Sequence, residues 1–493
     1  MKKTVKNRIP GVLIVVLLAI AMVLFMAILI KIKLLPLKFL LLAGGVFLLY
    51  AVCVFLLTRN SERVGAMICG CMMTMLLLIA LMLGTPYLTR AVDTLGNITG
   101  VDVEIADMGV YVEADSTMTQ LADLTGGSLG ILETLDRENT EKSLADVENQ
   151  IGTLQVQNYA GVKELADGLL NNEVDAILIN SAYLDLLTDV EGYTDIVSQL
   201  RKIYEYQAQT SIDIVEKKDP VNNWDVQELF GEKESKDRVF TMYISGIDSR
   251  SGLIAKSNSD VNILATVNVD TRQVLLVSTP RDFYVPLPIS NGIPDKLTHA
   301  GIYGIDVSVG TLEMLYNTEI DYYFRVNFSG FERIIDALGG VTVHSDYAFS
   351  AGKYSYSKGE NYLNGAEALR FARERKSFST GDRQRGKNQM EVIKAVIEKA
   401  MSPAILTGYM DIMEIVSGSF ETSMPYDLIA ELVRDQLDKG GSWNVVSCSV
   451  DGSDGNKIPY SMSTSAYVMI PDQSTVDAAI AKIQQVKNGE ILE

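Results

Sequence analysis

Three long uncharged stretches near the start of this 493-residue chain limit its fold more than any other feature. They cover residues 9–30, 39–58 and 64–89, and each is close to the ~20 apolar residues that a helix needs to cross a bilayer. A cleaved signal peptide is the alternative for the first stretch, but two more stretches follow directly and no small-residue cleavage site is evident. The sequence therefore predicts three transmembrane helices within residues 1–90.

Positive charges beside these stretches indicate the orientation of the chain. With three spans, the N-terminus and the second loop lie on one side and carry six Lys or Arg residues. The other side carries four, which are Lys31, Lys33, Lys38 and Arg90. Because the more basic side usually faces the cytoplasm, we expect a multi-pass protein of the plasma membrane whose C-terminal bulk is extracellular.

The charge balance and the cysteines argue against two classes of protein. The net charge is −19, although the first 90 residues carry ten basic residues and a single acidic one. The rest of the chain is thus strongly acidic, which argues against a nucleic acid as partner. Of the four cysteines, only Cys448 lies outside the apolar stretches, so a disulfide scaffold is excluded for the polar part. We expect Cys448 to be buried and inert.

Residues 91–225 combine strand-like and helix-like runs, which predicts an extracellular α/β accessory domain followed by a linker. Residues 101–112 are strand-like, and residues 159–187 read as a helix, a turn and a buried strand at 174–178. This pattern loosely resembles half of a substrate-binding protein. The alternative is a spacer that holds the next domain away from the membrane. Residues 216–237 are polar and lack periodicity, as is typical of a linker.

Residues 226–493 predict a larger domain of the α/β/α type, with a central mixed sheet flanked by helices. Residues 240–248, 261–269 and 273–280 are strand-like, and 261–269 is apolar on both faces, as in a sheet that helices cover. A helix-like run at 328–338 lies between further strand-like segments. Strands that are separated by helices favour this layered arrangement.

A cluster of positive charge interrupts the acidic domain at residues 370–387, where the sequence is RFARERKSFSTGDRQRGK. Seven basic and two acidic residues give it a local net charge of +5. Clustered like charges repel one another unless an anion lies among them, and planar guanidinium groups suit bidentate phosphate binding. A solvated charged face is the alternative, since that is what most runs of charge form.

Two predicted helices bring some of these arginines together. Asn364 is a candidate cap for the first helix, on which Arg370 and Arg373 share a face. The second helix runs from about residue 382 to residue 400, and one side of it carries Asp382, Arg385 and Gln389. The free N–H groups at its start also favour an anion. These features predict a cradle for a diphosphate.

Acidic and basic residues also follow the predicted strands of this domain. Asp248 lies just after one strand and Asp260 just before the next, so the two carboxylates can share a hard cation such as Mg²⁺. Arg281 and Asp282 follow a third strand. Ligands of open α/β sheets bind beyond the carboxyl ends of the strands. The acids and arginines together therefore predict a single phosphate site.

Several of these segments together resemble the LytR-CpsA-Psr family. The matching motifs run in order through residues 238–400 and are GIDSR, SDVNILATVN, PRDFYVP, DKLTHAG, DYYFRVNFSGF, DALGGV and LRFARERKSFSTGDRQRGKNQ. The three spans and the accessory domain are similar to the capsule-type branch. The resemblance implies a ligase of Gram-positive bacteria that transfers a wall glycopolymer from undecaprenyl diphosphate to peptidoglycan through a phosphodiester.

The resemblance also implies roles for eight residues of this sequence. Asp248 and Asp260 match the acids associated with Mg²⁺, for which Mn²⁺ is the alternative ion. The implied diphosphate-binding residues are Arg281, Arg373, Arg375, Asp382, Arg385 and Gln389. The implied catalytic residues are Asp260, Arg281, Arg373 and Arg375, with Asp260 as the candidate base. Asn258 departs from the family, which often has an arginine before this Ser-Asp pair.

The expected function is therefore a Mg²⁺-dependent phosphotransferase with a polyprenyl diphosphate-linked capsular polysaccharide or teichoic-acid-like polymer as donor. Its expected partners are peptidoglycan, membrane lipid and the capsule or wall-synthesis machinery, with no nucleic acid. One alternative is a hydrolase that cleaves polyprenyl diphosphates at the same site. Another is a membrane-bound transcriptional attenuator or sensor. His299 is expected to start a helix or pack rather than to act as a base.

Overall fold

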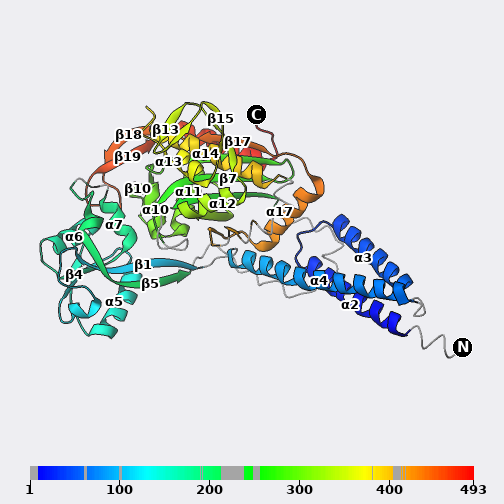
Figure 1. Ribbon diagram of the computed structural model, residues 1–493. Coiled ribbons are helices and arrows are strands. Elements are labelled where there is room, and N and C mark those ends of the chain that lie inside the picture. Colours follow the sequence, from blue (N-terminus) through cyan, green and yellow to red (C-terminus); the bar gives the residue numbers. More distant parts are fainter. Residues whose placement is uncertain are drawn as a thin grey trace. The chain divides into compact units, whose positions relative to one another are not determined.

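The computed structural model divides the chain into two compact units, which we describe separately (Figure 1). The first unit comprises Met1–Thr99, Ala400–Ser417 and Met424–Ser442, and the second comprises Gly100–Lys399, Gly418–Ser423 and Trp443–Glu493. The structure describes residues 9–59, 64–98, 103–188, 190, 192–211, 238–247, 256–379, 381–402, 412, 415–416 and 418–493. The predicted linker at 216–237 lies outside these residues.

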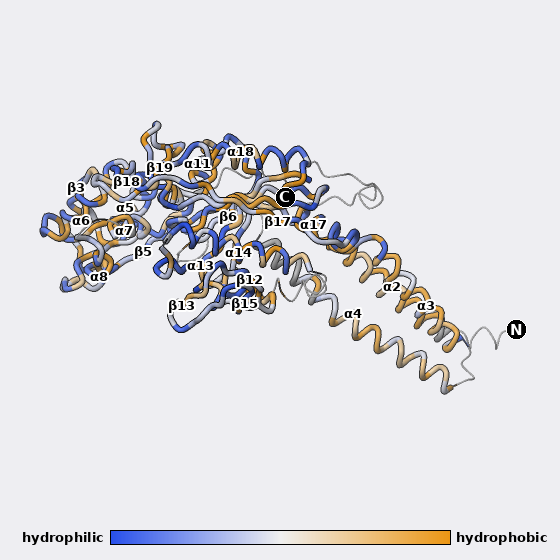
Figure 2. The backbone as a smooth tube through the Cα atoms, turned by 90° about the horizontal axis from the view of Figure 1, so that it is seen from above, coloured by the Kyte–Doolittle hydropathy of each residue, from blue (hydrophilic) through white to orange (hydrophobic). Residues whose placement is uncertain are grey.

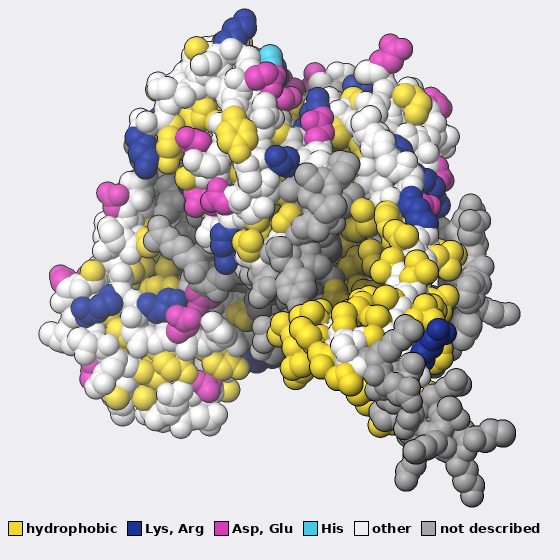
Figure 3. Space-filling model, turned by 45° about the vertical axis from the view of Figure 1, so that its right-hand side comes forward, with side chains coloured by type: hydrophobic (Ala, Val, Ile, Leu, Met, Phe, Trp, Pro, Cys, Tyr) yellow, Lys and Arg dark blue, Asp and Glu magenta, His cyan; other side chains and the backbone are white. Residues whose placement is uncertain are grey.

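Three long apolar helices dominate the first unit. They are α2 (Ile9–Lys31), α3 (Leu37–Thr58) and α4 (Val64–Ile98). Each contains a stretch that is long and apolar enough to span a membrane, which confirms the three predicted spans. Most of their residues are hydrophobic (Figure 2), and hydrophobic side chains cover most of their surface in the space-filling view (Figure 3). Leu49 and Leu83 are each 71% exposed. Apolar surface of this extent is unfavourable in water and suits a lipid environment.

A helix from far along the chain packs onto the connection between α2 and α3. This helix, α17 (Tyr426–Lys439), shares a small apolar cluster with Ile32 and Leu34. The Tyr426 hydroxyl donates a hydrogen bond of 2.6 Å to the Ile32 carbonyl oxygen. Lys38 Nζ lies 2.9 Å from Asp438 Oδ1. These contacts join the first turn of α17 to the α2–α3 connection and its last turn to the start of α3 within the first unit.

The accessory domain of the second unit is a five-stranded sheet in the order β3-β2-β4-β1-β5. Its strands are β1 (Val103–Glu113), β2 (Ser128–Leu132), β3 (Gln155–Tyr159), β4 (Ala176–Asn180) and β5 (Leu200–Ser211). Helix α5 (Arg137–Ile151) packs on one face, and α6 (Val162–Leu170) and α7 (Ser181–Leu187) pack on the other. The predicted strands at 101–112 and 174–178 correspond to β1 and β4.

The larger domain of the second unit contains a six-stranded mixed sheet in the order β16-β11-β6-β7-β8-β17. Its strands are β6 (Val239–Ile247), β7 (Ser259–Asn268), β8 (Gln273–Thr279), β11 (Tyr322–Asn327), β16 (Phe420–Thr422) and β17 (Asn444–Ser449). Strands β6, β8, β11 and β17 run in one direction, and β7 and β16 run in the other. The predicted mixed sheet of an α/β domain is confirmed.

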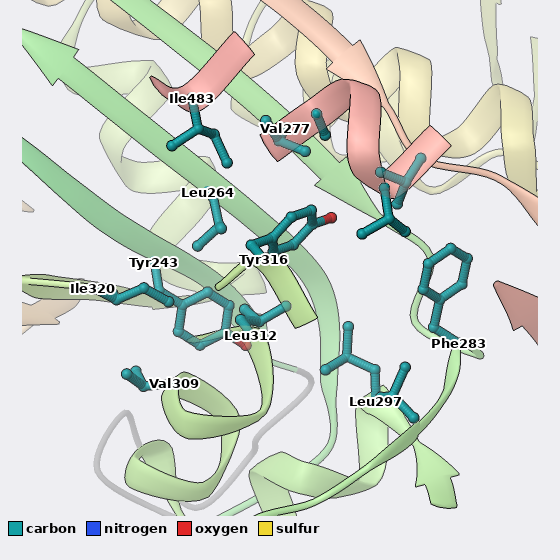
Figure 4. Packing of buried hydrophobic residues seen from close by; sticks show 14 of the residues in the cluster. Tyr243, Leu264, Val277, Phe283, Leu297, Val309, Leu312, Tyr316, Ile320 and Ile483 are labelled. Atoms are coloured by element: carbon teal, nitrogen blue, oxygen red, sulfur yellow. The ribbon is translucent and has the colours of Figure 1, made fainter. Parts of the chain in front are cut away.

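The main core of this domain lies between the sheet and three helices. The helices are α10 (Leu297–Tyr303), α11 (Ile305–Tyr316) and α18 (Gln473–Lys487). Figure 4 shows Tyr243 and Leu264 of the sheet packed against Leu312 and Tyr316 of α11. All four side chains are completely buried. The strand residues on this face therefore belong to the main core of the domain.

A second apolar cluster joins elements that carry the basic segment. It connects α12 (Phe328–Ala337), α13 (Gly365–Arg373) and α14 (Asp382–Ala400) with two hairpins. The hairpins pair β12 (Val341–Ser345) with β15 (Gly359–Leu363), and β13 (Phe349–Ala351) with β14 (Tyr354–Tyr356). Phe371 and Val392 are fully buried within this cluster, which fixes α13 against α14.

A buried ion-pair network joins the accessory domain to the larger domain. Arg325 on β11 lies between Glu104 on β1 and Glu421 on β16, with N–O distances of 2.6 and 3.2 Å. The three side chains are only 3–5% exposed. Glu104 Oε2 also accepts a hydrogen bond from the backbone N–H of Ile305. Charges removed from water in this way are stable only when paired, so the network ties the two domains together.

Glu421 should make the stability of this contact between the accessory domain and the larger domain depend on pH. Burial raises the pKa of Glu421 from its ordinary 4.5 to about 7, Arg325 opposes this rise, and Glu104 adds to it. The protonated carboxyl is thus favoured in the folded state. Its stabilising effect is complete below pH 4.5 and is lost as the pH rises through 7, a difference of roughly 3 kcal/mol.

The melting temperature of the full-length wild type should therefore fall between pH 5 and pH 8, and Glu421→Gln should make this fall smaller. Glutamine stays neutral throughout this range and keeps the shape of the side chain. Glu141→Gln on α5, where the carboxylate is 60% exposed, serves as the control and should melt like the wild type at each pH. A Glu421→Gln profile that is parallel to the wild-type profile would refute this assignment.

Candidate functional site

The strand directions bring Asp260 and Arg281 to one edge of the central sheet. Ser259 at the start of β7 pairs with Ile247 at the end of β6, and Asn262 pairs with Thr279 at the end of β8. Asp260 and Arg281 therefore both lie where β6 and β8 end. Arg281 Nη1 donates to Asp260 Oδ1 over 2.7 Å. This is the edge at which the sequence predicts a ligand.

A compact group of charges surrounds this pair. Lys296 Nζ and Arg281 Nε each lie 3.6 Å from the Asp282 carboxylate, and Arg385 Nη2 lies 2.5 Å from Asp382 Oδ1. Helix α14 approaches β8 closely here, since a Cβ atom on Gly386 would lie 3.4 Å from Ser278 Oγ. We call this group the inner cluster, and its members are Asp260, Arg281, Asp282, Lys296, Asp382 and Arg385.

The two arginines of the inner cluster differ in how well their charges are balanced. Burial opposes the charge on Arg281, but Asp260 and Asp282 outweigh burial and raise the pKa of this guanidinium. Burial lowers the pKa of Arg385, Arg281 adds to this effect, and Asp382 compensates only in part. The Arg385 side chain is 11% exposed. An anion placed beside Arg385 would therefore stabilise the charged form of this guanidinium against the effect of burial.

Arg281 also has an N–H group that lacks an acceptor. Its Nε atom is buried and makes no hydrogen bond within the described part of the chain. Asp282 Oδ2, at 3.6 Å, is too distant for one. A buried donor without a partner costs free energy, so an oxygen-rich ligand at this point would be stabilised.

Arg373 and Arg375 lie outside the inner cluster. Asn364 caps α13 as predicted, by accepting a hydrogen bond from the Glu367 N–H and donating its own N–H to the Glu367 carboxylate, both over 3.0 Å. Arg373 ends this helix, and its guanidinium lies 4.0 Å from the centre of the Phe328 ring at the carboxyl end of β11. Arg375 is exposed, and its guanidinium makes no hydrogen bond or ion pair with any described residue, although its carbonyl oxygen accepts a hydrogen bond from the Phe378 N–H.

The basic segment is not a single surface. Arg383 binds Asp451 Oδ1 over 2.7 Å and the Gly452 carbonyl oxygen over 2.7 Å. Its charge is therefore used to hold the loop after β17 rather than to add to the inner cluster. The +5 net charge of the sequence segment overstates the charge available to a ligand. Sequence reasoning missed Lys296, which lies beside Asp282 in the inner cluster. Its position in the DKLTHAG motif is the signal that could have indicated it.

The roles of all eight predicted site residues remain predictions, and for two of these residues the structure adds little. Asp248 lies outside the described residues. Gln389 is half-buried on α14, which begins at Asp382 as predicted, and its side chain makes no hydrogen bond with the described part of the protein. Residues 382, 385 and 389 do share one helix, with Arg385 buried and the other two half-buried.

The ligand atoms near Asp260 are oxygens, the type that a hard cation prefers. The described residues nevertheless contain no group of three or more His, Cys, Asp or Glu side chains placed to bind a metal. Asp260 offers carboxylate oxygens, and the buried Asn258 Oδ1 atom has no donor within the described chain. Mg²⁺ prefers such oxygen ligands and often takes only one or two from the protein. The metal role of Asp260 therefore stays a prediction.

His299 packs in the interior as the sequence indicated, whereas Cys448 is half-buried and not fully buried as predicted. The His299 ring is 2% exposed, and its Nδ1 atom lies 2.7 Å from Asp295 Oδ1 and 2.9 Å from Ser461 Oγ. In a catalytic Ser-His-Asp triad the serine and the aspartate bind different nitrogens of the ring. Here both contact Nδ1, so the arrangement is structural and not catalytic. Burial raises the pKa of the Cys448 thiol, which disfavours the reactive thiolate.

The fold is that of an α/β protein with three helices long and apolar enough to span a membrane and a cluster of charged side chains at one edge of its sheet. The chain belongs to the LytR_cpsA_psr family, whose model matches residues 200–485. This match confirms the family resemblance found in the sequence motifs.

The relatives of this chain include wall transferases. It is 34% identical to the polyisoprenyl-teichoic acid–peptidoglycan teichoic acid transferase TagU of Oceanobacillus iheyensis over 241 residues, which are 48% of this chain and 72% of the relative. It is 35% identical to TagU of Bacillus subtilis over 225 residues, or 45% and 72%. The crystal structure of B. subtilis TagV superposes with a TM-score of 0.42 and 27% identity, covering 51% of this chain and 97% of that one.

Proposed function

We propose that this protein is a membrane-anchored phosphotransferase that moves a glycopolymer from a polyprenyl diphosphate carrier to peptidoglycan. The observation that carries the proposal is the inner cluster. In it the Arg385 charge is buried and only partly compensated by Asp382, and Arg281 has a buried N–H without an acceptor among the described residues. The TagU relatives carry out such a transfer of teichoic acid. The donor here is a teichoic-acid-like polymer or, on the resemblance to the capsule-type branch, a capsular polysaccharide.

Charge balance indicates that the inner cluster needs further cations to hold a diphosphate. Its three basic and three acidic members sum to zero. Arg373 and Arg375, exposed on the neighbouring segment, can supply two positive charges. Mg²⁺ on the oxygens of Asp260, and on those of Asp248, would supply two more and neutralise charge on the phosphate oxygens.

The proposed reaction is a substitution at phosphorus. A sugar hydroxyl of peptidoglycan attacks the phosphorus atom that bears the glycopolymer, and a new P–O bond forms. The bond between this phosphorus and the bridging oxygen breaks, and polyprenyl phosphate leaves with the electron pair. Such reactions depend on positioning and charge neutralisation more than on covalent help. Arg281 and Arg385 hold the phosphate oxygens, and Asp260 accepts the hydroxyl proton.

Transfer from a defined donor tests this function. The purified full-length protein is incubated with a labelled polyprenyl diphosphate-linked teichoic acid or capsular polysaccharide, peptidoglycan and Mg²⁺. We expect label joined to peptidoglycan by a bond that phosphodiester cleavage releases. Free polymer phosphate in place of this product would identify the hydrolase alternative. Absence of both products with either donor would contradict the proposal.

The packing of α17 supports an extracellular C-terminal bulk. Helix α17 lies within residues 200–485, which the family model matches, and it packs on the α2–α3 connection. The family region and this connection therefore share one side of the membrane. The N-terminus, one span earlier, lies on the opposite side. With the basic N-terminus in the cytoplasm, the proposed site faces the extracellular peptidoglycan.

Labelling of single cysteines tests this topology. In a chain whose native cysteines are replaced by serine, Lys38→Cys and Asp438→Cys should both react with a membrane-impermeant thiol reagent added to intact cells. Both wild-type side chains are about half exposed, at 49% and 52%. Labelling of only one position would contradict the packing of α17 on the connection. Labelling of neither until the cells are broken would place both in the cytoplasm and revive the attenuator alternative.

A further inference from the structure

The accessory domain places a buried carboxylate in the larger domain. Glu104 lies on β1, where most neighbours are apolar, and it is 5% exposed. It binds Arg325 of β11 over 2.6 Å and the backbone N–H of Ile305 at the start of α11 over 3.2 Å. A side chain of the accessory domain thus satisfies two donors of the larger domain.

The next residue of β1 reaches the segment that leads to Asp260. The backbone N–H of Lys256 donates to the carbonyl oxygen of Ile105 over 2.9 Å. Lys256 lies four residues before Asp260, the inner-cluster acid that binds Arg281. A main-chain hydrogen bond of this kind fixes the position of the backbone and not merely that of one side chain.

The Glu104 contact acts on a second strand at the same edge. Arg325 lies two residues before the end of β11, and Phe328, which follows directly, carries Arg373 over its ring. Glu104 and Ile105 are therefore connected to both sides of the candidate site. One side is the start of β7 with Asp260, and the other is the end of β11 with Arg373.

We propose that the accessory domain is a positioning element of the catalytic site, in which Glu104 and Ile105 fix the segments that carry Asp260 and Arg373. This proposal rests on the proposed function for its catalytic readout. It gives residues 103–211 a role in the reaction beyond that of a spacer. Reacting groups displaced by even a fraction of an ångström lose much of their effect in the transition state, so this joint acts on turnover more than on donor binding.

Glu104→Ala and Glu104→Gln in the full-length protein test the proposal, with Glu141→Gln as a matched exposed carboxylate of the same domain. We expect Glu104→Ala to lower kcat by about tenfold or more while KM for the lipid-linked donor and the donor-binding stoichiometry stay unchanged. Unchanged stoichiometry distinguishes poor positioning from a smaller folded fraction. Glu104→Gln still accepts hydrogen bonds and should recover part of the loss. Glu141→Gln should match the wild type.

Amide hydrogen exchange provides a readout that does not depend on activity. Glu104→Ala should speed exchange in the peptide that contains Lys256 and in the one that covers the end of β11. Exchange in α18, which belongs to the main core, should not change. If Glu104→Ala exchanged like the wild type, Glu104 would not fix these two segments of the larger domain. Faster exchange with a full transfer rate would overturn the positioning role. If the wild type transferred nothing, the proposed function would fail while the exchange data still tested the joint.

Discussion

Arg385→Ala should lower glycopolymer transfer by about 10³-fold or more, the effect expected when a phosphate-stabilising arginine is lost. Arg383→Ala, two residues away in the same basic segment, should leave transfer close to the wild-type rate. Arg385 is buried beside Asp382 and Arg281, where burial leaves its charge incompletely balanced. Arg383 instead holds Asp451 and the Gly452 carbonyl group.

The comparison of these two variants separates a general effect of positive charge from an effect of the position of Arg385 in the inner cluster. Both remove one positive charge, so a general electrostatic effect on the anionic donor would impair them equally. Arg385→Lys keeps the charge but loses the planar fork of the guanidinium, and we expect an intermediate rate. Transfer assays on purified variants with wild-type melting temperatures provide the measurement. Equal losses in both alanine variants, or an active Arg385→Ala variant, would count against the assigned site.

Asp260→Asn should lower transfer by about 10²-fold or more, since a positioned proton acceptor contributes an effect of this size. The same substitution should also raise the Mg²⁺ concentration needed for the half-maximal rate. The substitution removes both the proton acceptor and a charged oxygen ligand for the cation. It keeps the size of the side chain. It also removes the negative charge that pairs with Arg281 over 2.7 Å, although the amide oxygen can still accept a hydrogen bond. Chelation of divalent cations should stop transfer by the wild type.

Asp270→Asn is the matched control for this experiment. Asp270 follows β7 at the opposite edge of the sheet, pairs with Arg238 and is 61% exposed. Its replacement should change neither the rate nor the Mg²⁺ requirement. The metal assignment would be wrong if Asp260→Asn kept the wild-type Mg²⁺ dependence, or if full transfer persisted after chelation.

Local sequence signals were sufficient to predict the membrane helices and the helices of the basic segment. Each span is a continuous apolar run, and a run of this length is rarely anything other than a membrane-spanning helix. The Asn364 cap and the start of α14 at Asp382 depend on residues within one or two turns of each other. The pairing of Asp260 with Arg281 could be anticipated because both lie at strand ends on one edge.

Contacts between distant segments could not be predicted in this way. Glu104 and Arg325 are 221 residues apart, and neither lies in a local pattern that indicates the other. Tyr426 and Ile32 are 394 residues apart. The sequence also could not show that Arg383 is already paired with Asp451, because the balance of charge at a site depends on which side chains the fold brings together.

A structure of the full-length protein with a polyprenyl diphosphate and Mg²⁺ tests the central claim most directly. We predict diphosphate oxygens within hydrogen-bond distance of Arg281 Nε and of the Arg385 guanidinium, at the edge where β6 and β8 end. A diphosphate bound elsewhere, with Arg281 still paired to Asp260 and Arg385 still paired to Asp382 as in the present structure, would contradict it.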